Sequence, residues 1–297
     1  MPITLLQIII LGLVQGAAEL LPISSSAHVI VAEKLMGIDP ASPEATFLLV
    51  MLHTGTMIAV IAYFWKAWAA RYFSEPARLK AVAVQAVVAT ALTGILGFGL
   101  KQAIEKTFLA GRGSGQIEEL FGSLPLISAA LAAVGVLIIV AGRARASAGP
   151  GDEVTVRSAA GMGLVQGLAL PFRGFSRSGS TISAGLLLGT GRRAAEEFSF
   201  VLAVILTPPV IARELHRLIK MRAAETEQHH LAHLVAPGLA GLACSLVAGL
   251  VALKLLSRWL EQGRWKLFGY YCLAAAAITC GPYSRSSASM PCRTWRR

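Results

Sequence analysis

Hydrophobic positions in this chain are gathered into long, nearly uninterrupted stretches separated by short polar segments. A helix needs about 20 consecutive apolar residues to cross the hydrocarbon core of a bilayer. A helix also satisfies its own backbone hydrogen bonds, which makes it the expected spanning element in lipid. The pattern predicts six spanning helices, near residues 45–65, 81–100, 124–142, 197–215, 232–256 and 267–281.

Two further apolar segments, 2–37 and 159–191, are interrupted in the middle by Pro, Gly and Ser. The interruptions are Pro22 to Ser26 in the first segment and Pro171 to Ser180 in the second. Irregular backbone at membrane depth leaves polar groups that lipid cannot satisfy, so it persists only inside protein or beside a wet cavity. The sequence therefore predicts two re-entrant hairpins, each made of two half-helices joined by a functional loop.

The pentapeptide GLVQG occurs twice, at Gly12–Gly16 and at Gly163–Gly167, and it precedes each interruption. Each hairpin is followed by three predicted spans, and an odd number of spans inverts the second half relative to the first. The predicted fold is an all-α polytopic membrane protein, an inverted repeat of two halves that each hold one re-entrant hairpin and three transmembrane helices. The small residues of GLVQG predict that the two broken elements pack closely against each other.

This pattern divides the chain into three parts. Residues 1–150 form the first predicted repeat and residues 151–281 the second. Residues 282–297 form a Ser- and Arg-rich tail that we expect to be disordered and to which the sequence assigns no function.

Composition agrees with a membrane protein. The 297 residues are 55% hydrophobic and only 14% charged, whereas soluble domains carry about 25% charged residues. The first twenty residues lack a basic region and a cleavage site, so no removable signal peptide is expected. The four cysteines have no metal-finger spacing.

The formal net charge of +11 does not indicate a nucleic-acid partner, because the basic residues lie between the apolar stretches. Basic segments beside spanning helices are typical of the cytoplasmic side, which places both chain termini outside. The segment 101–123 has balanced charge and fits an external loop, whereas Arg213–Arg222 and the tail do not fit this orientation. The basic segments that define the cytoplasmic side are 66–80, 143–157, 192–193 and 254–266.

The first hairpin concentrates polar groups in an otherwise apolar segment. Gln15 and Glu19 are four residues apart and share one helix face. Pro22 interrupts the helix, and Ser24–Ser26 and His28 follow. If these residues have only a structural role, the serines cap the second half-helix and Glu19 pairs with a distant Arg. Ionisable groups inside membrane segments are costly and usually functional, so the complete set favours a site.

The second hairpin carries the string RGFSRSGST, whose glycines permit a tight loop with N–H groups directed at an anion. Its arginine fork and hydroxyls suit a phosphate. Because GxxxxGK[ST] is absent from the sequence, a nucleotide is not indicated. The alternative to phosphate binding is that the arginine pairs with Glu19 and has only a structural role. The candidate residues are Arg173, Gly174, Ser176, Arg177, Ser178, Ser180 and Thr181.

At these residues the sequence resembles the undecaprenyl-diphosphate phosphatase family, also called bacitracin-resistance proteins, over nearly the whole chain to about Thr279. The family motif (E/Q)xxxE followed by PxSS and His matches Gln15, Glu19, Pro22, Ser24, Ser25 and His28. The family motif PGxSRSxxT matches Gly174, Ser176, Arg177, Ser178 and Thr181. The sequence departs from this second motif at Arg173, which replaces the usual Pro.

The resemblance implies hydrolysis of undecaprenyl diphosphate to the monophosphate and inorganic phosphate, which recycles the lipid carrier for peptidoglycan synthesis and confers bacitracin resistance. It also implies a divalent cation, Mg²⁺ or Ca²⁺, and a multi-pass protein of the cell inner membrane whose site faces the periplasm. The expected partners are the polyprenyl diphosphate substrate and membrane lipids, with a homodimer left open.

Within this reading, Glu19 and Gln15 are the candidates for holding the metal, because hard cations prefer oxygen ligands. The candidate substrate contacts are Ser24, Ser26, Arg173, Gly174, Ser176, Ser178 and Thr181, and Arg177 is the candidate for stabilising the charge that develops. Either Ser25 attacks with help from His28, or His28 activates water; the spacing leaves both open. His53 is interpreted as a packing residue.

A different class of protein, a transporter or flippase of a polyprenyl phosphate lipid, is the main alternative. Inverted repeats with broken helices are typical of transporters, and a phosphate-binding loop suits an anionic lipid headgroup. Such a protein uses Arg177 and Glu19 for binding only and releases no phosphate.

Overall fold

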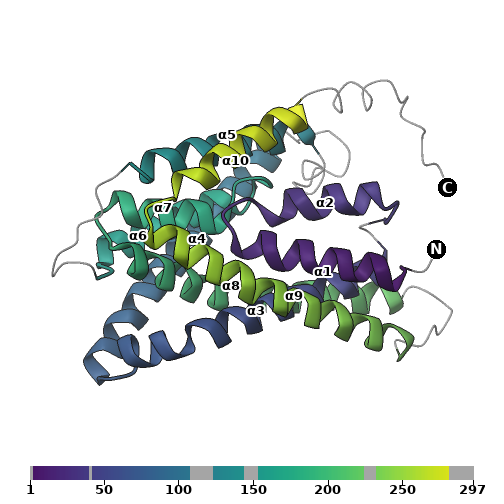
Figure 1. The fold of residues 1–297 in the computed structure, drawn as a ribbon, viewed down its shortest axis with the longest axis horizontal. Helices are drawn as coiled ribbons and strands as arrows, with labels where there is room; N and C mark the ends of the chain where they lie inside the picture. Colours follow the sequence, from purple (N-terminus) through teal and green to yellow (C-terminus); the bar gives the residue numbers. More distant parts are fainter. Residues whose placement is uncertain (1–2, 40–41, 108–122, 144–152, 224–231, 281–297) are drawn as a thin grey trace.

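The computed structural model describes residues 3–39, 42–107, 123–143, 153–223 and 232–280 (Figure 1). Within these ranges every helix or strand assigned is an α-helix, which confirms the all-α prediction. The predicted tail, 282–297, lies outside the described residues. The helices are α1 (Leu5–Leu20), α2 (Ser25–Leu35), α3 (Pro43–Tyr72), α4 (Pro76–Thr107), α5 (Leu124–Ala141), α6 (Val156–Ala169), α7 (Arg177–Leu187), α8 (Arg192–Ala223), α9 (Ala232–Glu261) and α10 (Lys266–Cys280).

In the part of the chain that the structure describes, five helices are long and apolar enough to cross a membrane: α3, α4, α5, α8 and α9. They correspond to five of the six predicted spans, and the chain is accordingly described as a polytopic membrane protein. The sixth predicted span forms α10, which has only 15 residues. At 1.5 Å per residue such a helix is about 22 Å long, shorter than the hydrocarbon core of about 30 Å.

Both predicted interruptions separate two helices. Helix α1 ends at Leu20 and α2 begins at Ser25, whereas α6 ends at Ala169 and α7 begins at Arg177. Figure 1 shows the outer ends of α1 and α2 at the end of the molecule where the N-terminus lies, and those of α6 and α7 toward the opposite end. The two breaks therefore approach the middle of the molecule from opposite ends.

Local backbone geometry explains why the chain turns at these breaks. Ser24 has a φ of +68° and Gly174 a φ of +101°, values in the left-handed region that only glycine adopts without strain. Ser24 occupies the N-cap position of α2 but makes no side-chain cap bond. Ser176 caps α7, and its hydroxyl accepts a hydrogen bond from the backbone N–H of Gly179 at 3.2 Å.

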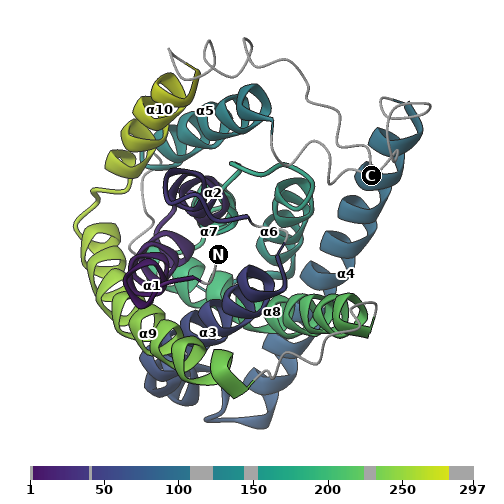
Figure 2. The ribbon, with the colours of Figure 1, turned by 90° about the vertical axis from the view of Figure 1, so that its right-hand side faces the viewer.

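Helices from the two halves of the chain pack side by side. Helix α1 packs on α9, α6 on α4, α5 on α10 and α3 on α8. In the end-on view α2 and α7 lie near the centre, with α4, α5, α9 and α10 around the outside (Figure 2). This arrangement surrounds the two breaks with longer helices.

The repeated GLVQG lies where these helices approach most closely. A Cβ added to Gly16 would lie 2.5 Å from the carbonyl oxygen of Ser245 on α9, and one added to Gly163 would overlap the backbone of Ala89 on α4. The prediction that the two broken elements use these glycines to pack on each other was wrong. The glycines instead allow α1 and α6 each to pack on a long helix, and the two breaks meet where α1 ends and α7 begins.

Replacing Gly163 with alanine should destabilise the fold, because the new methyl group would overlap the backbone of Ala89. Backbone atoms cannot relieve an overlap by a change of rotamer, as a side chain could. Overpacking of this kind costs about 1–3 kcal/mol, so the thermal unfolding temperature in detergent should fall clearly. Gly94→Ala on α4 is the matched control: nothing lies within 4 Å of its Cβ, and it should leave that temperature unchanged or raise it. Equal unfolding temperatures for the two variants would contradict this packing argument.

Candidate active site

The two helix breaks contact each other through an ion pair. A guanidinium nitrogen of Arg177, at the start of α7, lies 3.0 Å from Oε1 of Glu19, at the end of α1. The exposed fractions of the two side chains are 19% and 18%. Beside them, the Ser178 hydroxyl donates to the carbonyl oxygen of Leu21 at 3.4 Å. Because charges are expensive to remove from water, this half-buried pair is better placed to bind a ligand than to add stability.

The second oxygen of the Glu19 carboxylate accepts two further hydrogen bonds. The hydroxyl of Ser25 donates to Oε2 at 2.6 Å, a length typical of a hydrogen bond to an ionised acceptor. The amide nitrogen of Gln15 donates to the same oxygen at 3.3 Å. The structure thus brings together four of the predicted site residues around one carboxylate: Gln15, Glu19, Ser25 and Arg177.

A cavity of about 300 Å³, which we call the central cavity, opens beside this cluster. Nη1 of Arg177 is buried without a hydrogen-bond partner among the described residues, so the arginine retains a donor for an anion. Apolar residues of the second break, including Leu170, Phe172 and Phe175, complete the wall. The polar residues that line the central cavity are Glu19, Ser24, Ser25, Ser26, His53, Arg173, Ser176, Arg177, Ser178 and Thr207.

Three candidate residues of the second hairpin do not line the central cavity. Thr181 is fully buried and bonds the carbonyl oxygen of Arg177 at 2.8 Å and the hydroxyl of Ser199 at 2.6 Å. Ser180 donates to the same carbonyl at 3.0 Å. Gly174 shapes the loop, since a Cβ there would lie 2.5 Å from the carbonyl oxygen of Ile127. These residues hold the loop of the second break and the start of α7 in place.

His28 also lies outside the central cavity. Its Nδ1 bonds the carbonyl oxygen of Ser24 at 2.8 Å, and its Nε2 bonds the hydroxyl of Tyr271 on α10 at 2.7 Å. The two rings are stacked with their centres 5.8 Å apart. Both ring nitrogens are therefore used to hold the first break against α10. The structure does not bring His28 to the Ser25 hydroxyl.

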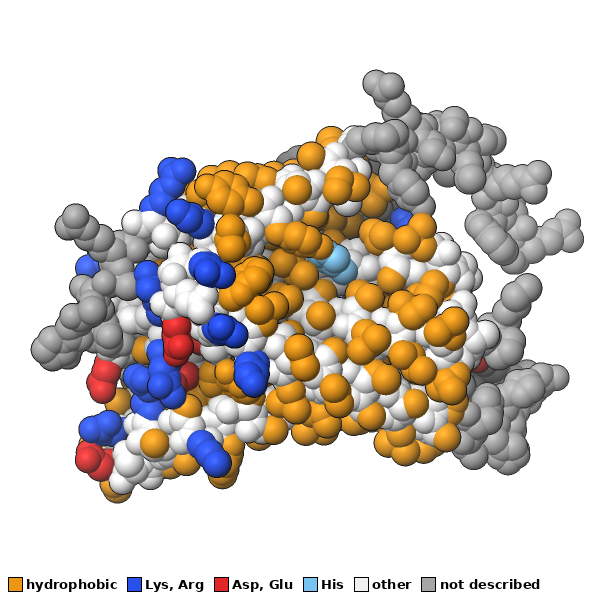
Figure 3. Space-filling model, viewed as in Figure 1, with side chains coloured by type: hydrophobic (Ala, Val, Ile, Leu, Met, Phe, Trp, Pro, Cys, Tyr) orange, Lys and Arg blue, Asp and Glu red, His pale blue; other side chains and the backbone are white. Residues whose placement is uncertain are grey.

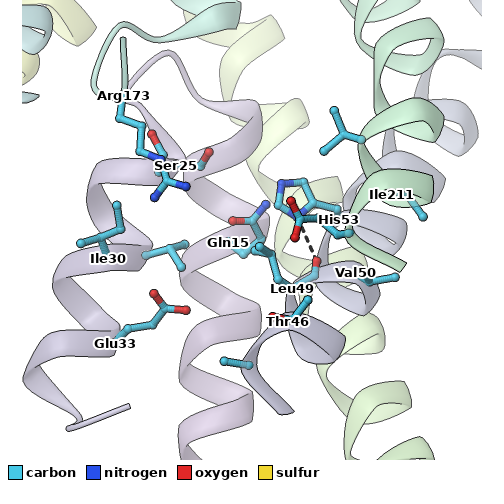
Figure 4. Close-up of a pocket in the computed structure, with 15 residues that line it drawn as sticks. Gln15, Ser25, Ile30, Glu33, Thr46, Leu49, Val50, His53, Arg173 and Ile211 are labelled. Carbon is cyan, nitrogen blue, oxygen red and sulfur yellow. Dashed lines mark hydrogen bonds between the residues drawn. The ribbon is translucent and has the colours of Figure 1, made fainter. Parts of the chain in front are cut away.

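A second cavity of about 240 Å³, the side cavity, adjoins the first (Figure 4). It extends along α2 and α3 as far as Glu33 and Thr46. The two cavities share five lining residues, which mark their junction: Ser25, Ser26, His53, Arg173 and Val210. Arg173, which replaces the usual Pro of the second motif, therefore borders both cavities.

His53 is the residue that sequence reasoning missed. Its Nδ1 donates to the carbonyl oxygen of Leu49 at 2.9 Å, and the ring borders both cavities. The interpretation of His53 as a packing residue placed it among the apolar side chains of a spanning helix. The available signal was the polar run HTGT inside that helix, because polar groups at membrane depth tend to face a cavity.

The residues around Glu19 fit a divalent cation that is shared with a phosphate ligand. Mg²⁺ commonly takes one or two carboxylates together with substrate phosphates. Glu19 supplies a carboxylate, and Gln15 donates through its nitrogen, which leaves its amide oxygen for a cation. No group of three His, Cys, Asp or Glu side chains suited to a metal occurs among the described residues. Glu19 and Gln15 are therefore the residues that would hold such a cation.

Comparison with known proteins places this architecture in one family. The family described as "Bacitracin resistance protein BacA" matches residues 8–278, and the chain belongs to it.

The named relatives are similar over almost their whole length. An "Undecaprenyl-diphosphatase 2" of Acinetobacter baylyi is 54% identical over 276 residues, which cover 92% of this chain and 96% of the relative. An "Undecaprenyl-diphosphatase" of Desulfosudis oleivorans is 35% identical over 293 residues, covering 92% and 97%. One of Moorella thermoacetica is 36% identical over 283 residues, covering 93% and 97%.

Proposed function

We propose that this protein is an integral membrane phosphatase that hydrolyses undecaprenyl diphosphate to undecaprenyl phosphate and inorganic phosphate. Through this activity it recycles the lipid carrier of peptidoglycan synthesis and confers resistance to bacitracin. Family membership and the names of the relatives support the assignment. The observation that carries it is the contact of Arg177 with Glu19 beside the Ser25 hydroxyl, which joins an anion-binding group, a carboxylate and a nucleophile at one cavity.

We further propose that the two helix pairs are re-entrant hairpins and that the two halves form an inverted repeat. The corresponding packing of α1 on α9 and of α6 on α4 supports this. On the face shown in Figure 3, Lys and Arg side chains gather at one end of the molecule. This supports a cytoplasmic position for that end, in the cell inner membrane, with the site open to the periplasm. The homodimer stays a prediction.

In the proposed reaction Ser25 attacks the terminal phosphorus. Its hydroxyl already donates to Glu19 at 2.6 Å, so the carboxylate is placed to accept the proton as the Ser25 oxygen bonds to phosphorus. Undecaprenyl phosphate leaves, and a phosphoserine remains. This geometry supports Glu19 as the proton acceptor, while His28 holds the turn that carries Ser25.

The terminal phosphate is bound from the second break. Arg177 offers Nη1, which has no hydrogen-bond partner among the described residues, and Ser176 and Ser178 line the same wall. Arg173, at the junction of the two cavities, is placed to contact the phosphate that stays on the lipid. Ser24 and Ser26 complete the wall on the side of the first break. Guanidinium groups suit this task because they bind phosphate oxygens through two parallel N–H groups.

A bound divalent cation, held by Glu19 and Gln15 together with the diphosphate, would neutralise part of the substrate's negative charge. We expect chelation with excess EDTA to abolish phosphate release, and added Mg²⁺ or Ca²⁺ to restore it. The measurement is phosphate release by the purified protein before and after each addition. Full release at a chelator concentration that removes both cations would contradict the cation requirement.

The test of the function is release of inorganic phosphate from undecaprenyl diphosphate by the purified protein in detergent with Mg²⁺. Equimolar undecaprenyl phosphate and inorganic phosphate are the expected products. If a folded, metal-supplied protein forms neither, the phosphatase proposal fails. The same protein in vesicles would then be examined for movement of polyprenyl phosphate lipid between leaflets, which is the transporter alternative.

A further inference from the structure

The junction between the two cavities contains an imidazole that the motifs do not include. We propose that His53 is a further catalytic residue, the base that activates the water molecule hydrolysing the phosphoserine formed at Ser25. The inference rests on the proposed function and adds a role for the second half of the reaction. It follows from the position of His53, its hydrogen bond and the geometry of displacement at phosphorus.

The position of His53 suits a reacting water. Attacking and leaving oxygens lie roughly in line on opposite sides of the transferred phosphorus. When phosphoserine is hydrolysed, Ser25 is the leaving group, so the base for water must lie on another wall of the cavity. Ser25 begins α2 and His53 lies on α3, and Figure 4 shows the two residues on different sides of the side cavity. Both border the junction with the side cavity.

The hydrogen bond of His53 selects the tautomer that a base requires. A carbonyl oxygen only accepts, so the contact of Nδ1 with Leu49 at 2.9 Å places the proton of the neutral ring on Nδ1. Nε2 then carries the lone pair, and no protein donor engages it among the hydrogen bonds of the described residues. The ring is half-buried and close enough to Glu19 for the two groups to interact electrostatically.

The other groups near the phosphorus are already engaged. Once the phosphoserine has formed, Glu19 holds the proton that it accepted from Ser25, and its other oxygen is bonded to Arg177. Both ring nitrogens of His28 are bonded to protein. The side cavity is large enough to hold water beside His53. Its lining includes the buried hydroxyl of Thr46, which has no hydrogen-bond partner in the part of the chain that the structure describes.

The proposed step balances as follows. The water oxygen forms a bond to phosphorus while the bond from phosphorus to the Ser25 oxygen breaks. The water proton passes to Nε2 of His53, and the Ser25 oxygen regains the proton that Glu19 accepted in the first step. Inorganic phosphate and free Ser25 result, and His53 then gives its extra proton to solvent.

Two variants at His53 separate a catalytic role from a structural one. In His53→Asn the side-chain nitrogen can keep the hydrogen bond to Leu49 but the cavity nitrogen is lost; in His53→Gln an amide replaces the distal nitrogen. Each is mixed with undecaprenyl diphosphate labelled with ³²P on the terminal phosphate, in detergent with Mg²⁺. Samples are quenched in acid, and the lipid product, free phosphate and protein-bound label are measured separately.

We expect both variants to form about one equivalent of undecaprenyl phosphate and of protein-bound label in a first burst. Phosphate release should then fall by about 10²–10⁴-fold, the usual contribution of a general base. Adding Ser25→Ala should remove the label. His216→Gln, at an exposed histidine of α8, is the matched control and should behave as the wild type.

Two results would overturn the role of His53: phosphate release near the wild-type rate, or an equal fall in both products without protein-bound label. Either result leaves the phosphatase assignment intact, because the wild type still forms both products. A wild-type protein that forms neither product contradicts the proposed function and this inference together.

Discussion

Replacing Arg177 with alanine should lower kcat for phosphate release by about 10³-fold or more, the scale on which arginines contribute to phosphoryl transfer. The variant loses the donor that faces the phosphate, and it also leaves the Glu19 carboxylate without its cationic partner at 3.0 Å. Arg177→Lys keeps the positive charge but loses the planar guanidinium with its paired N–H groups. Its kcat should therefore lie between that of Arg177→Ala and that of the wild type. The measurement is phosphate release from undecaprenyl diphosphate at saturating substrate.

A matched control for Arg177 lies outside the lining of both cavities. Arg192 begins α8 and donates to the carbonyl oxygen of Glu261 at 3.2 Å, on an exposed surface. Arg192→Ala removes the same side chain far from the central cavity and should leave kcat near the wild-type value. If Arg177→Ala retains wild-type turnover as well, the central cavity is not the site of phosphate release.

The sequence was sufficient to predict the positions of the elements. The interruptions at Pro22 and Pro171 fall between paired helices, and five of the six predicted spans are long apolar helices. These features depend on local physics: runs of apolar residues favour spanning helices, and proline with glycine ends them. The partners of the GLVQG glycines were not predictable in this way, because small residues permit close packing without specifying which helix approaches.

Only part of the site was predictable, because local patterns in the sequence do not specify contacts between distant residues. Glu19 and Arg177 are 158 residues apart in the chain, and their pairing was one of the interpretations that the two interrupted segments left open. The spacing of His28, three residues after Ser25, left open whether the imidazole would help the Ser25 hydroxyl or activate water. The side chain turns instead to Tyr271 on α10, a contact that no local pattern contains. His53 enters the site from α3, where the polar run HTGT was the available signal.

Replacing Ser25 with alanine should abolish turnover to within background, because the proposed covalent step loses its nucleophile. No labelled phosphate should remain on the protein after an acid quench, whichever residue occupies position 53. The structural reason is the 2.6 Å hydrogen bond to Glu19, which sets the Ser25 oxygen at the wall of the cavity with an acceptor for its proton. Ser74→Ala, in the exposed turn between α3 and α4, is the matched control and should keep full activity.

Ser25→Ala also decides between the two attacking groups that the sequence left open. If water attacks the diphosphate directly, the variant loses one hydrogen bond to Glu19 and should retain a large part of its turnover. Near-normal phosphate release would therefore exclude the serine nucleophile and, with it, the phosphoserine on which the role of His53 depends. Loss of both turnover and label, with unchanged folding by size-exclusion chromatography, would instead require Ser25 as the group that attacks phosphorus.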